Sequence, residues 1–267
     1  MHTSPIVEAV IFDHDGTLAP TLERQEQWFK HYSEMQGKSW GFTFEEFREF
    51  YNQLCALEGG VQNVYDRLGL PSSIRDKTHP VWPAFEAFNR EHPLELYPGM
   101  RETVEELWRI GALTENVLRN RRMRLGVNTT NSWKSIRGDL EKGGVLPYFD
   151  SFVTKEVLDT YHGSGNGAAL YKPSKVSIAL MLGLLGSNGN TTVHIGDTVN
   201  DLLASHEVMR FDPGRKETLI TVGAGYGYEG REKLEDGAEV DGERIHFTHL
   251  INEPRELVGI VKGYLGK

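Results

Sequence analysis

Cysteine is almost absent from this chain of 267 residues, which contains only Cys55. A single thiol cannot form a disulfide within the chain, and the ten histidines and the cysteine show no spacing typical of a zinc site. We therefore expect the fold to depend on a hydrophobic core, and a reducing compartment suits such a protein.

An excess of basic residues is also missing. The 29 Lys and Arg residues are outnumbered by 38 Asp and Glu residues, which gives a formal net charge of −9 at pH 7. Proteins that bind nucleic acids or acidic membranes use broad basic surfaces, so we expect neither as a partner. A small anionic substrate stays compatible with this charge, because it needs only a local binding site.

Long apolar runs are lacking too. The longest covers residues 178–185, which is far shorter than the roughly 20 residues that span a bilayer. The first residues show neither the basic nor the apolar region of a signal peptide. These features predict a cytoplasmic protein without a membrane segment.

The pattern of strands and helices predicts an α/β fold. Apolar strands are expected at residues 8–12, 124–130, 152–154, 191–195 and 218–222. Helical patterns at 100–110, 132–141, 174–185 and 199–208 alternate with them. Such alternation is typical of a Rossmann-like, mostly parallel sheet with helices on both faces. The glycine-rich segment 223–227 is expected to be a turn after the last core strand.

Residues 20–96 differ from the rest of the chain. They show only helical patterns, and they contain 13 of the 27 aromatic residues. Thr43 and Glu46 form a capping box, which predicts a helix start. We expect an all-helical cap domain at 20–96, inserted into a core made of 1–19 and 97–267. The turn at Glu58, Gly59 and Gly60 is either a loop that reaches the substrate or a plain turn between helices.

Polar side chains follow the predicted strands, at the edge of the sheet where open α/β proteins bind ligands. Asp13 and Asp15 follow the first strand, and Thr129, Thr130 and Asn131 lie at the end of the second. Lys172 precedes a helix, and Asp197 and Asp201 follow the strand at 191–195. Carboxylates this close together repel one another, which suggests a bound cation or a shared catalytic task.

This ordered set resembles the motifs of the haloacid dehalogenase superfamily. The segment Asp-His-Asp-Gly-Thr at 13–17 is similar to the first motif, Thr130 to the second, Lys172 to the third, and Gly-Asp-Thr-Val-Asn-Asp at 196–201 to the fourth. The position of the helical insertion resembles the branch that contains phosphoglycolate phosphatases and β-phosphoglucomutases.

The resemblance implies a mechanism. Asp13 would be the nucleophile that forms an aspartyl-phosphate, and Asp15 would be the general acid and base. Thr130 and Lys172 would hold the phosphoryl oxygens, assisted by backbone groups at His14, Gly16 and Asn131. Mg²⁺ would be the cofactor. Its ligands would be Asp13, Asp15 through its carbonyl, Asp197 and, directly or indirectly, Asp201.

The expected activity is hydrolysis of a small phosphorylated metabolite, either phosphoglycolate-like or a sugar phosphate. A phosphomutase would use the same residues, and a non-catalytic binding protein of the same fold is a less favoured alternative. The general acid Asp15 argues against a dehalogenase, because the dehalogenases of this superfamily lack an aspartate at this position. The sequence leaves a monomer and a homodimer equally open.

Overall fold

The chain separates into two units of unequal size. A computed structural model describes residues 7–265 except 56, 58, 74–75, 77, 114–121, 164–166, 188–191 and 211–218. The core unit comprises Met1–Ala19 and Glu95–Lys267, and the cap unit comprises Pro20–Leu94. In the described ranges, no helix has the length and apolar character needed to cross a membrane.

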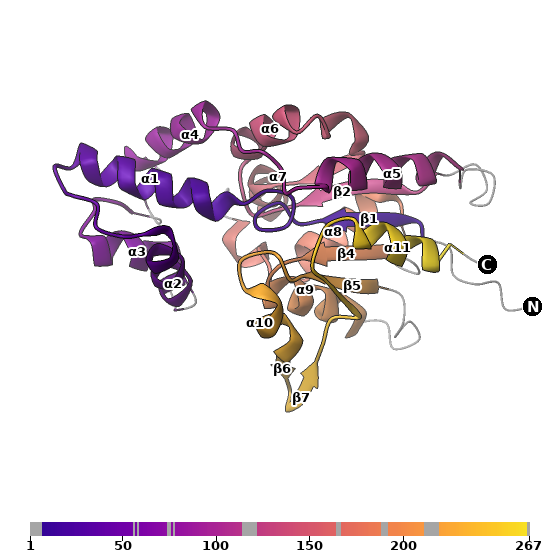
Figure 1. The fold of residues 1–267 in the computed structure, drawn as a ribbon. Coiled ribbons are helices and arrows are strands. Elements are labelled where there is room, and N and C mark those ends of the chain that lie inside the picture. Colours follow the sequence, from indigo (N-terminus) through magenta and orange to yellow (C-terminus); the bar gives the residue numbers. More distant parts are fainter. Residues whose placement is uncertain are drawn as a thin grey trace, which may run out of the picture. The chain divides into compact units, whose positions relative to one another are not determined.

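A six-stranded parallel sheet forms the centre of the core unit (Figure 1), which confirms the predicted fold class. Its spatial order is β3-β2-β1-β4-β5-β8. The strands are β1 (Ala9–Phe12), β2 (Arg124–Asn128), β3 (Ser151–Val153), β4 (Thr192–Gly196), β5 (Leu219–Ala224) and β8 (His249–Ile251). Because all six run in the same direction, their carboxyl ends lie at one edge of the sheet.

Helices cover both faces of this sheet, so the central strands are buried along almost their whole length rather than on alternate residues. All four residues of β1 are buried, with Val10 and Phe12 on one face and Ala9 and Ile11 on the other. Helices α5 (Met100–Leu113), α6 (Trp133–Lys142) and α11 (Glu256–Gly263) pack on the first face. Helices α7 (Lys155–His162), α8 (Val176–Leu185) and α9 (Val199–Arg210) pack on the second.

The C-terminal part of the core unit differs from the sequence prediction. The turn at 223–227 does not follow the last core strand, because β8 extends the sheet beyond β5. Along the chain, helix α10 (Gly230–Asp236) and the antiparallel pair β6 (Ala238–Val240) and β7 (Glu243–Ile245) come between β5 and β8 (Figure 1). These elements are three to seven residues long, too short for a periodic pattern to show in the sequence.

The cap unit is made of helices that pack around aromatic side chains. Its helices are α1 (Thr21–Met35), α2 (Phe44–Cys55), α3 (Val61–Leu68) and α4 (Val81–Glu91). Trp28 is buried, stacks on Tyr32 at 5.0 Å between ring centroids, and donates from Nε1 to the Tyr65 hydroxyl at 2.7 Å. This hydrogen bond satisfies the buried indole N–H inside an otherwise apolar cluster.

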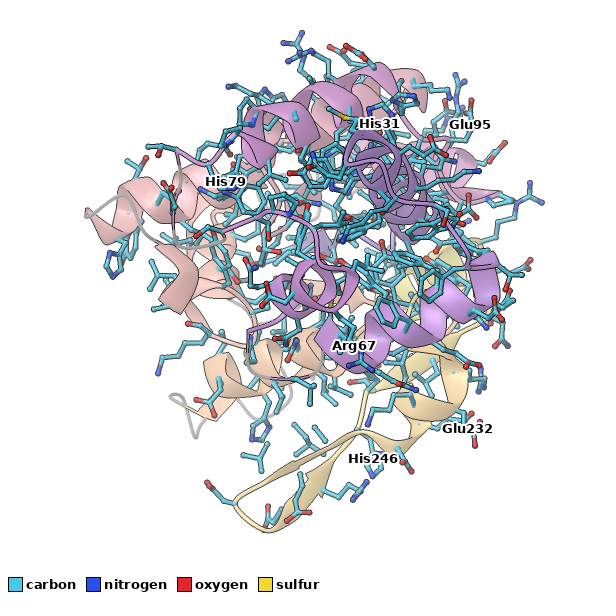
Figure 2. All side chains as sticks on the ribbon, turned by 90° about the vertical axis from the view of Figure 1, so that its left-hand side faces the viewer. His31, Arg67, His79, Glu95, Glu232 and His246 are labelled. Atoms are coloured by element: carbon cyan, nitrogen blue, oxygen red, sulfur yellow. The ribbon has the colours of Figure 1, made fainter. Side chains whose placement is uncertain are left out.

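The capping box at the start of α2 forms as its residues predict. The Thr43 N–H donates to Glu46 Oε2 at 2.8 Å, and the Glu46 N–H donates to Thr43 Oγ1 at 3.3 Å. In the predicted turn before α3, Gly59 and Gly60 have positive φ angles of 108° and 56°. Glu58 lies outside the described residues, and Figure 2 shows Arg67 of α3, whose side chain is exposed.

Candidate active site

The segment Asp13–Thr17 leaves β1 at the carboxyl edge of the sheet and folds back on itself. The Asp13 N–H donates to the Ile195 carbonyl of β4 at 2.9 Å, which continues the sheet by one residue. Two backbone N–H groups, of Leu18 and Ala19, donate to the His14 carbonyl at 3.0 and 3.1 Å. This turn holds Asp13 and Asp15 at the carboxyl edge of the sheet.

Gly16 allows the turn to approach the end of β4. Its φ angle is +72°, which other residues adopt only with strain. A Cβ atom here would lie 1.9 Å from Asp197 Oδ2, so only glycine leaves room for that carboxylate. The Gly16 N–H already donates to the Ala19 carbonyl at 2.9 Å, and therefore the structure gives it no free donor for a substrate.

Lys172 joins two of the acidic side chains. Its ammonium group pairs with Asp13 Oδ1, lies 2.6 Å from Asp201 Oδ1 and donates to the Asn128 carbonyl at 3.2 Å. The side chain of Lys172 is only 8% exposed. Burial opposes its charge, but Asp13 and Asp201 outweigh burial and raise the pKa of the ammonium group.

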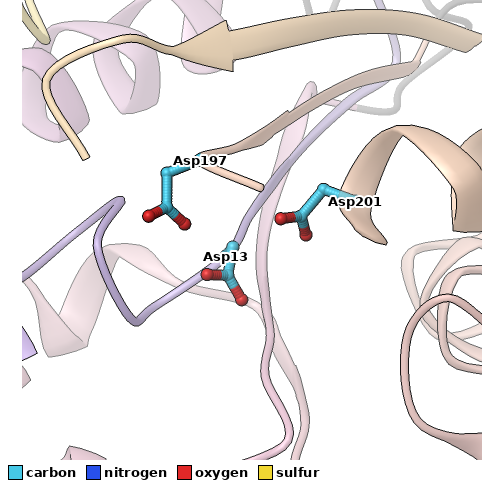
Figure 3. A group of neighbouring side chains, drawn as sticks. All are labelled: Asp13, Asp197 and Asp201. Atoms are coloured by element: carbon cyan, nitrogen blue, oxygen red, sulfur yellow. The ribbon is translucent and has the colours of Figure 1, made fainter. Parts of the chain in front are cut away.

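Three carboxylates converge beside this lysine. Oxygen atoms of Asp13, Asp197 and Asp201 lie within 4.8 Å of one another (Figure 3), and all three residues are buried. Burial raises the pKa of Asp13 to about 7, and the negative charges of Asp201 and Asp15 add to this shift. Burial also raises the pKa of Asp197. Lys172 alone thus does not balance the negative charge of the three carboxylates.

Asp201 is the best compensated member of the cluster. It accepts a hydrogen bond from the Thr198 hydroxyl at 2.8 Å, besides its pair with Lys172. Burial acts to raise the pKa of Asp201, but the charges of Lys172 and His194 outweigh burial and lower it. At neutral pH Asp201 is therefore ionised.

Asp197 is held by groups that the sequence analysis did not identify. Its Oδ2 accepts from the Tyr228 N–H at 2.7 Å, and its Oδ1 from the Thr17 hydroxyl at 3.4 Å. Tyr228 belongs to the loop between β5 and α10, where the Tyr226 hydroxyl donates to the Thr17 carbonyl at 3.1 Å. A backbone N–H has no sequence pattern, so only the glycine run at 223–227 hints at this close approach.

The carboxylate of Asp15 lies apart from the acidic cluster. It accepts from Asn131 Nδ2 at 2.7 and 2.8 Å and from the Thr129 hydroxyl at 3.3 Å. Strand β2 ends at Asn128, and the side chain of Thr129 that meets Asp15 is buried. The role of Thr130 at the phosphoryl oxygens stays a prediction. In the described part of the chain, no hydrogen bond of the Thr130 side chain is seen.

A family comparison agrees with this geometry. The model of the haloacid dehalogenase-like hydrolases matches residues 10–209, three quarters of the chain. The chain belongs to this family. The match confirms the predicted resemblance, and it identifies the chain as a hydrolase.

Individual relatives of this hydrolase extend over most of its length. Protein CbbY of Cereibacter sphaeroides is 27% identical over 202 residues, 75% of this chain and 80% of CbbY. Pyrophosphatase PpaX of Bacillus velezensis is 24% identical over 241 residues, 87% of this chain and 89% of PpaX. The crystal structure of a CbbY mutant from Rhodobacter sphaeroides in complex with xylulose-(1,5)bisphosphate has a TM-score of 0.57 at 22% identity, covering 94% and 96% of the two chains.

The acidic cluster of the hydrolase could hold a divalent cation. Its donors are carboxylate oxygens only, which suit a hard cation such as Mg²⁺ better than the softer metals that select nitrogen or sulfur. A cation would also supply the positive charge that the raised pKa values of Asp13 and Asp197 show to be lacking. The carboxylate of Asp15 is turned toward Asn131, so from Asp15 only the carbonyl is a candidate ligand.

Proposed function

We propose that this hydrolase is a Mg²⁺-dependent phosphatase that acts on a small phosphorylated metabolite through an aspartyl-phosphate on Asp13. One observation carries the proposal. Asp13 lies in the acidic cluster with Lys172 on one of its oxygens, while the carboxylate of Asp15, two residues further on, lies outside the cluster. The two aspartates therefore have different surroundings, as a nucleophile and a general acid require.

Asp13 would attack phosphorus with a carboxylate oxygen. A bond forms between that oxygen and phosphorus, and the bond between phosphorus and the ester oxygen breaks. Asp15 would give its proton to the leaving oxygen, so that an alcohol departs. In the second step Asp15 would take a proton from water, the water oxygen would bind phosphorus, and Asp13 would be released with inorganic phosphate.

Lys172 would stabilise negative charge on the phosphoryl oxygens in the transition state. The raised pKa of its ammonium group favours the charged form that this role needs. The Thr130 hydroxyl stays the candidate donor to the phosphoryl oxygens, because the Thr129 hydroxyl already donates to Asp15 Oδ2 at 3.3 Å. The backbone N–H of His14 is a second candidate, whereas the Asn131 N–H already donates to Thr129 Oγ1 at 3.1 Å.

The metal site would be formed by Asp13, Asp197 and the Asp15 carbonyl, with Asp201 as a direct or indirect ligand. A bound Mg²⁺ neutralises charge between an anionic nucleophile and a phosphate dianion. Lys172 and Thr198 would keep Asp201 ionised and oriented toward this site, and Tyr228 would do the same for Asp197 through its backbone N–H.

The proposed substrate is a small ester such as a sugar phosphate or a phosphoglycolate-like compound. This choice is supported by CbbY, crystallised with xylulose-(1,5)bisphosphate. The name of PpaX, a pyrophosphatase, points instead to a phosphoanhydride, so pyrophosphate is the second candidate substrate. In this proposal the cap unit sets the substrate range. Cationic side chains of the cap unit could pair with a carboxylate of the substrate. Of four such residues, Lys30 and Arg67 are exposed, Arg24 is buried, and Arg75 lies outside the described residues.

Phosphate release from a panel of sugar phosphates, phosphoglycolate and pyrophosphate tests the proposal. We expect release with Mg²⁺, none with EDTA, and a loss of at least about 10³-fold in Asp13→Asn and Asp15→Asn. Gly259→Ala, a helix substitution with no heavy atom within 4 Å of the new Cβ, is the matched control and should keep full activity.

Other outcomes would contradict the proposal. Conversion of a hexose 1-phosphate to the 6-phosphate with a bisphosphate primer, without phosphate release, would indicate a phosphomutase. A folded protein that binds Mg²⁺ but turns over none of these compounds would indicate a non-catalytic binding protein.

A further inference from the structure

A histidine and an aspartate meet inside the core unit, next to the proposed general acid. His14 and Asp139 are both 0% exposed, and His14 Nε2 lies 3.4 Å from Asp139 Oδ2. The other ring nitrogen, Nδ1, lies 3.5 Å from Asp15 Oδ1. The imidazole thus stands between two carboxylates, one in the interior and one at the active site.

Asp139 is a carboxylate in the apolar interior of the core unit. It lies on the inward face of α6 beside Ile136 and Leu140, which are both fully buried in the hydrophobic core. An aliphatic side chain at this position would avoid the cost of removing a carboxylate from water. A polar residue on the apolar face of a helix, facing a second buried polar residue, indicates a role beyond stability.

The surroundings of Asp15 suggest what that role is. Its carboxylate accepts two contacts from Asn131 Nδ2 and one from the Thr129 hydroxyl, both in the segment between β2 and α6. His14 Nδ1 approaches Oδ1 of the same carboxylate. Asp139 belongs to the helix that follows this segment, so one stretch of chain provides Thr129, Asn131 and Asp139.

We propose that His14 and Asp139 are positioning residues for Asp15. A proton between His14 Nε2 and Asp139 Oδ2 makes the contact that orients the imidazole ring, and the Nδ1–H of His14 donates to Asp15 Oδ1. This contact holds the carboxyl group where it can exchange a proton with the leaving oxygen. The role needs no change in the charge of the ring, and it rests on the phosphatase function proposed above.

The two distances fit such a role in a structure without substrate. Both exceed the roughly 2.7–3.2 Å of a formed N–H···O hydrogen bond. Catalytic hydrogen bonds are often long before substrate binds and shorten in the complex. Rotation of the Asp15 carboxyl group away from Asn131 would free it to shorten its contact with His14.

Leaving groups of different basicity test the proposal. An alkyl phosphate needs a proton on its leaving oxygen, whereas 4-nitrophenyl phosphate releases a stable phenolate without one. For His14→Leu we expect kcat to fall about 10- to 100-fold on the alkyl ester and less than about threefold on 4-nitrophenyl phosphate, with KM unchanged. Asp139→Asn should show the same preference with a smaller loss.

Two amide substitutions separate the two ring nitrogens. The amide nitrogen of Asn is as many bonds from the backbone as His Nδ1, and that of Gln as many as His Nε2. His14→Asn should therefore keep activity on the alkyl ester within about fivefold, whereas His14→Gln should lose it as His14→Leu does. His14→Gln also replaces His14→Leu if the leucine variant does not fold.

A double-mutant cycle and a structural control complete the design. His14→Gln should reduce activity no further in an Asp15→Asn background, because its effect passes through Asp15. Asp150→Asn removes the carboxylate that accepts from the Leu125 N–H at 3.0 Å, at the opposite end of β2. This control should lower thermal stability and leave the ratio of the two activities unchanged.

Three results would overturn the proposal. One is an equal loss on both esters in His14→Gln, which would indicate a general structural effect. Another is a full additional loss in the Asp15→Asn background. If the wild-type protein releases phosphate from neither ester and from no compound of the panel above, the phosphatase function itself is wrong and the positioning role falls with it. The wild-type rates therefore distinguish failure of the function from failure of this inference.

Discussion

Substitution of Gly227 by alanine should displace Asp197, a proposed metal ligand that lies 30 residues earlier in the chain. Gly227 lies in the loop between β5 and α10, and its φ angle is not positive, so the backbone itself suits alanine. The obstacle is steric. A Cβ atom at this position would lie 2.3 Å from the Asp197 Cβ and 2.4 Å from the Gly16 carbonyl oxygen.

The expected loss follows from these contacts. Carbon atoms in ordinary contact are about 3.5–4.0 Å apart, so the loop has to move by roughly 1 Å or more. Such a shift breaks the 2.7 Å hydrogen bond from the Tyr228 N–H to Asp197 Oδ2. Overpacking costs about 1–3 kcal/mol, and loss of a hydrogen bond to a charged group costs about 1.5–3 kcal/mol. We expect the free energy of unfolding to fall by about 3 kcal/mol.

Thermal unfolding and Mg²⁺ titration measure the two consequences. A loss of about 3 kcal/mol lowers Tm by about 6–12 °C in a chain of this size. Displacement of Asp197 should weaken Mg²⁺ binding about 10- to 100-fold, the usual effect of losing a group that supports a ligand. Gly259→Ala, in helix α11 with nothing within 4 Å of its Cβ, is the matched control and should raise stability by about 0.5–1 kcal/mol.

The reasoning is refuted if Gly227→Ala unfolds at the wild-type temperature and binds Mg²⁺ as tightly as the wild-type protein. A loss of stability with unchanged Mg²⁺ affinity would refute only the predicted displacement of Asp197, because Asp197 would then keep its position without the hydrogen bond from the Tyr228 N–H.

Three further predictions concern charge and packing. Folding raises the pKa of Asp13 to about 7, so between about pH 4 and pH 7 the folded protein keeps a proton that the unfolded chain has released. Urea titrations of the metal-free protein should therefore show lower stability at pH 8 than at pH 5, with a smaller difference in Asp13→Asn. Lys172→Met should lower the free energy of unfolding at pH 8 by about 3 kcal/mol, because the carboxylates of Asp13 and Asp201 lose their buried partner. At pH 5 the loss should be smaller. The same urea titrations measure both losses, and an equal loss at the two pH values would contradict the prediction. Tyr65→Phe should destabilise the cap unit by about 1–3 kcal/mol, because the buried Trp28 N–H loses its hydrogen-bond acceptor. Unfolding followed by tryptophan fluorescence measures this loss, and an unchanged unfolding curve would contradict the prediction.

Much of the candidate active site can be predicted from the sequence, because its acidic residues follow strands that have a strong local pattern. Asp13 and Asp15 come after the buried strand β1, and Asp197 comes directly after β4. In a parallel sheet these strand ends share one edge, so their proximity follows from the predicted topology. The structure brings Asp13, Asp197 and Asp201 together at that edge with Lys172.

The end of β2 shows where local patterns fail. Alternation along a strand tells which residues share a face, but β2 is buried on both faces and therefore shows no alternation of polar and apolar residues. Which of two consecutive threonines faces Asp15 depends on where the strand ends and how the next segment turns. The predicted strand was two residues longer than β2, and only the structure shows that it is Thr129 that contacts Asp15.

The sequence by itself therefore determined the family, the parallel α/β core and the order of the acidic and basic residues along the sheet edge. Those features depend on local periodicity and on short motifs next to strands. The tertiary structure alone decided the role of the Tyr228 N–H, the meeting of His14 with Asp139, and the addition of β8 to the sheet. These depend on backbone groups and on pairs of residues far apart in the chain, whose proximity arises only when the whole core unit has packed.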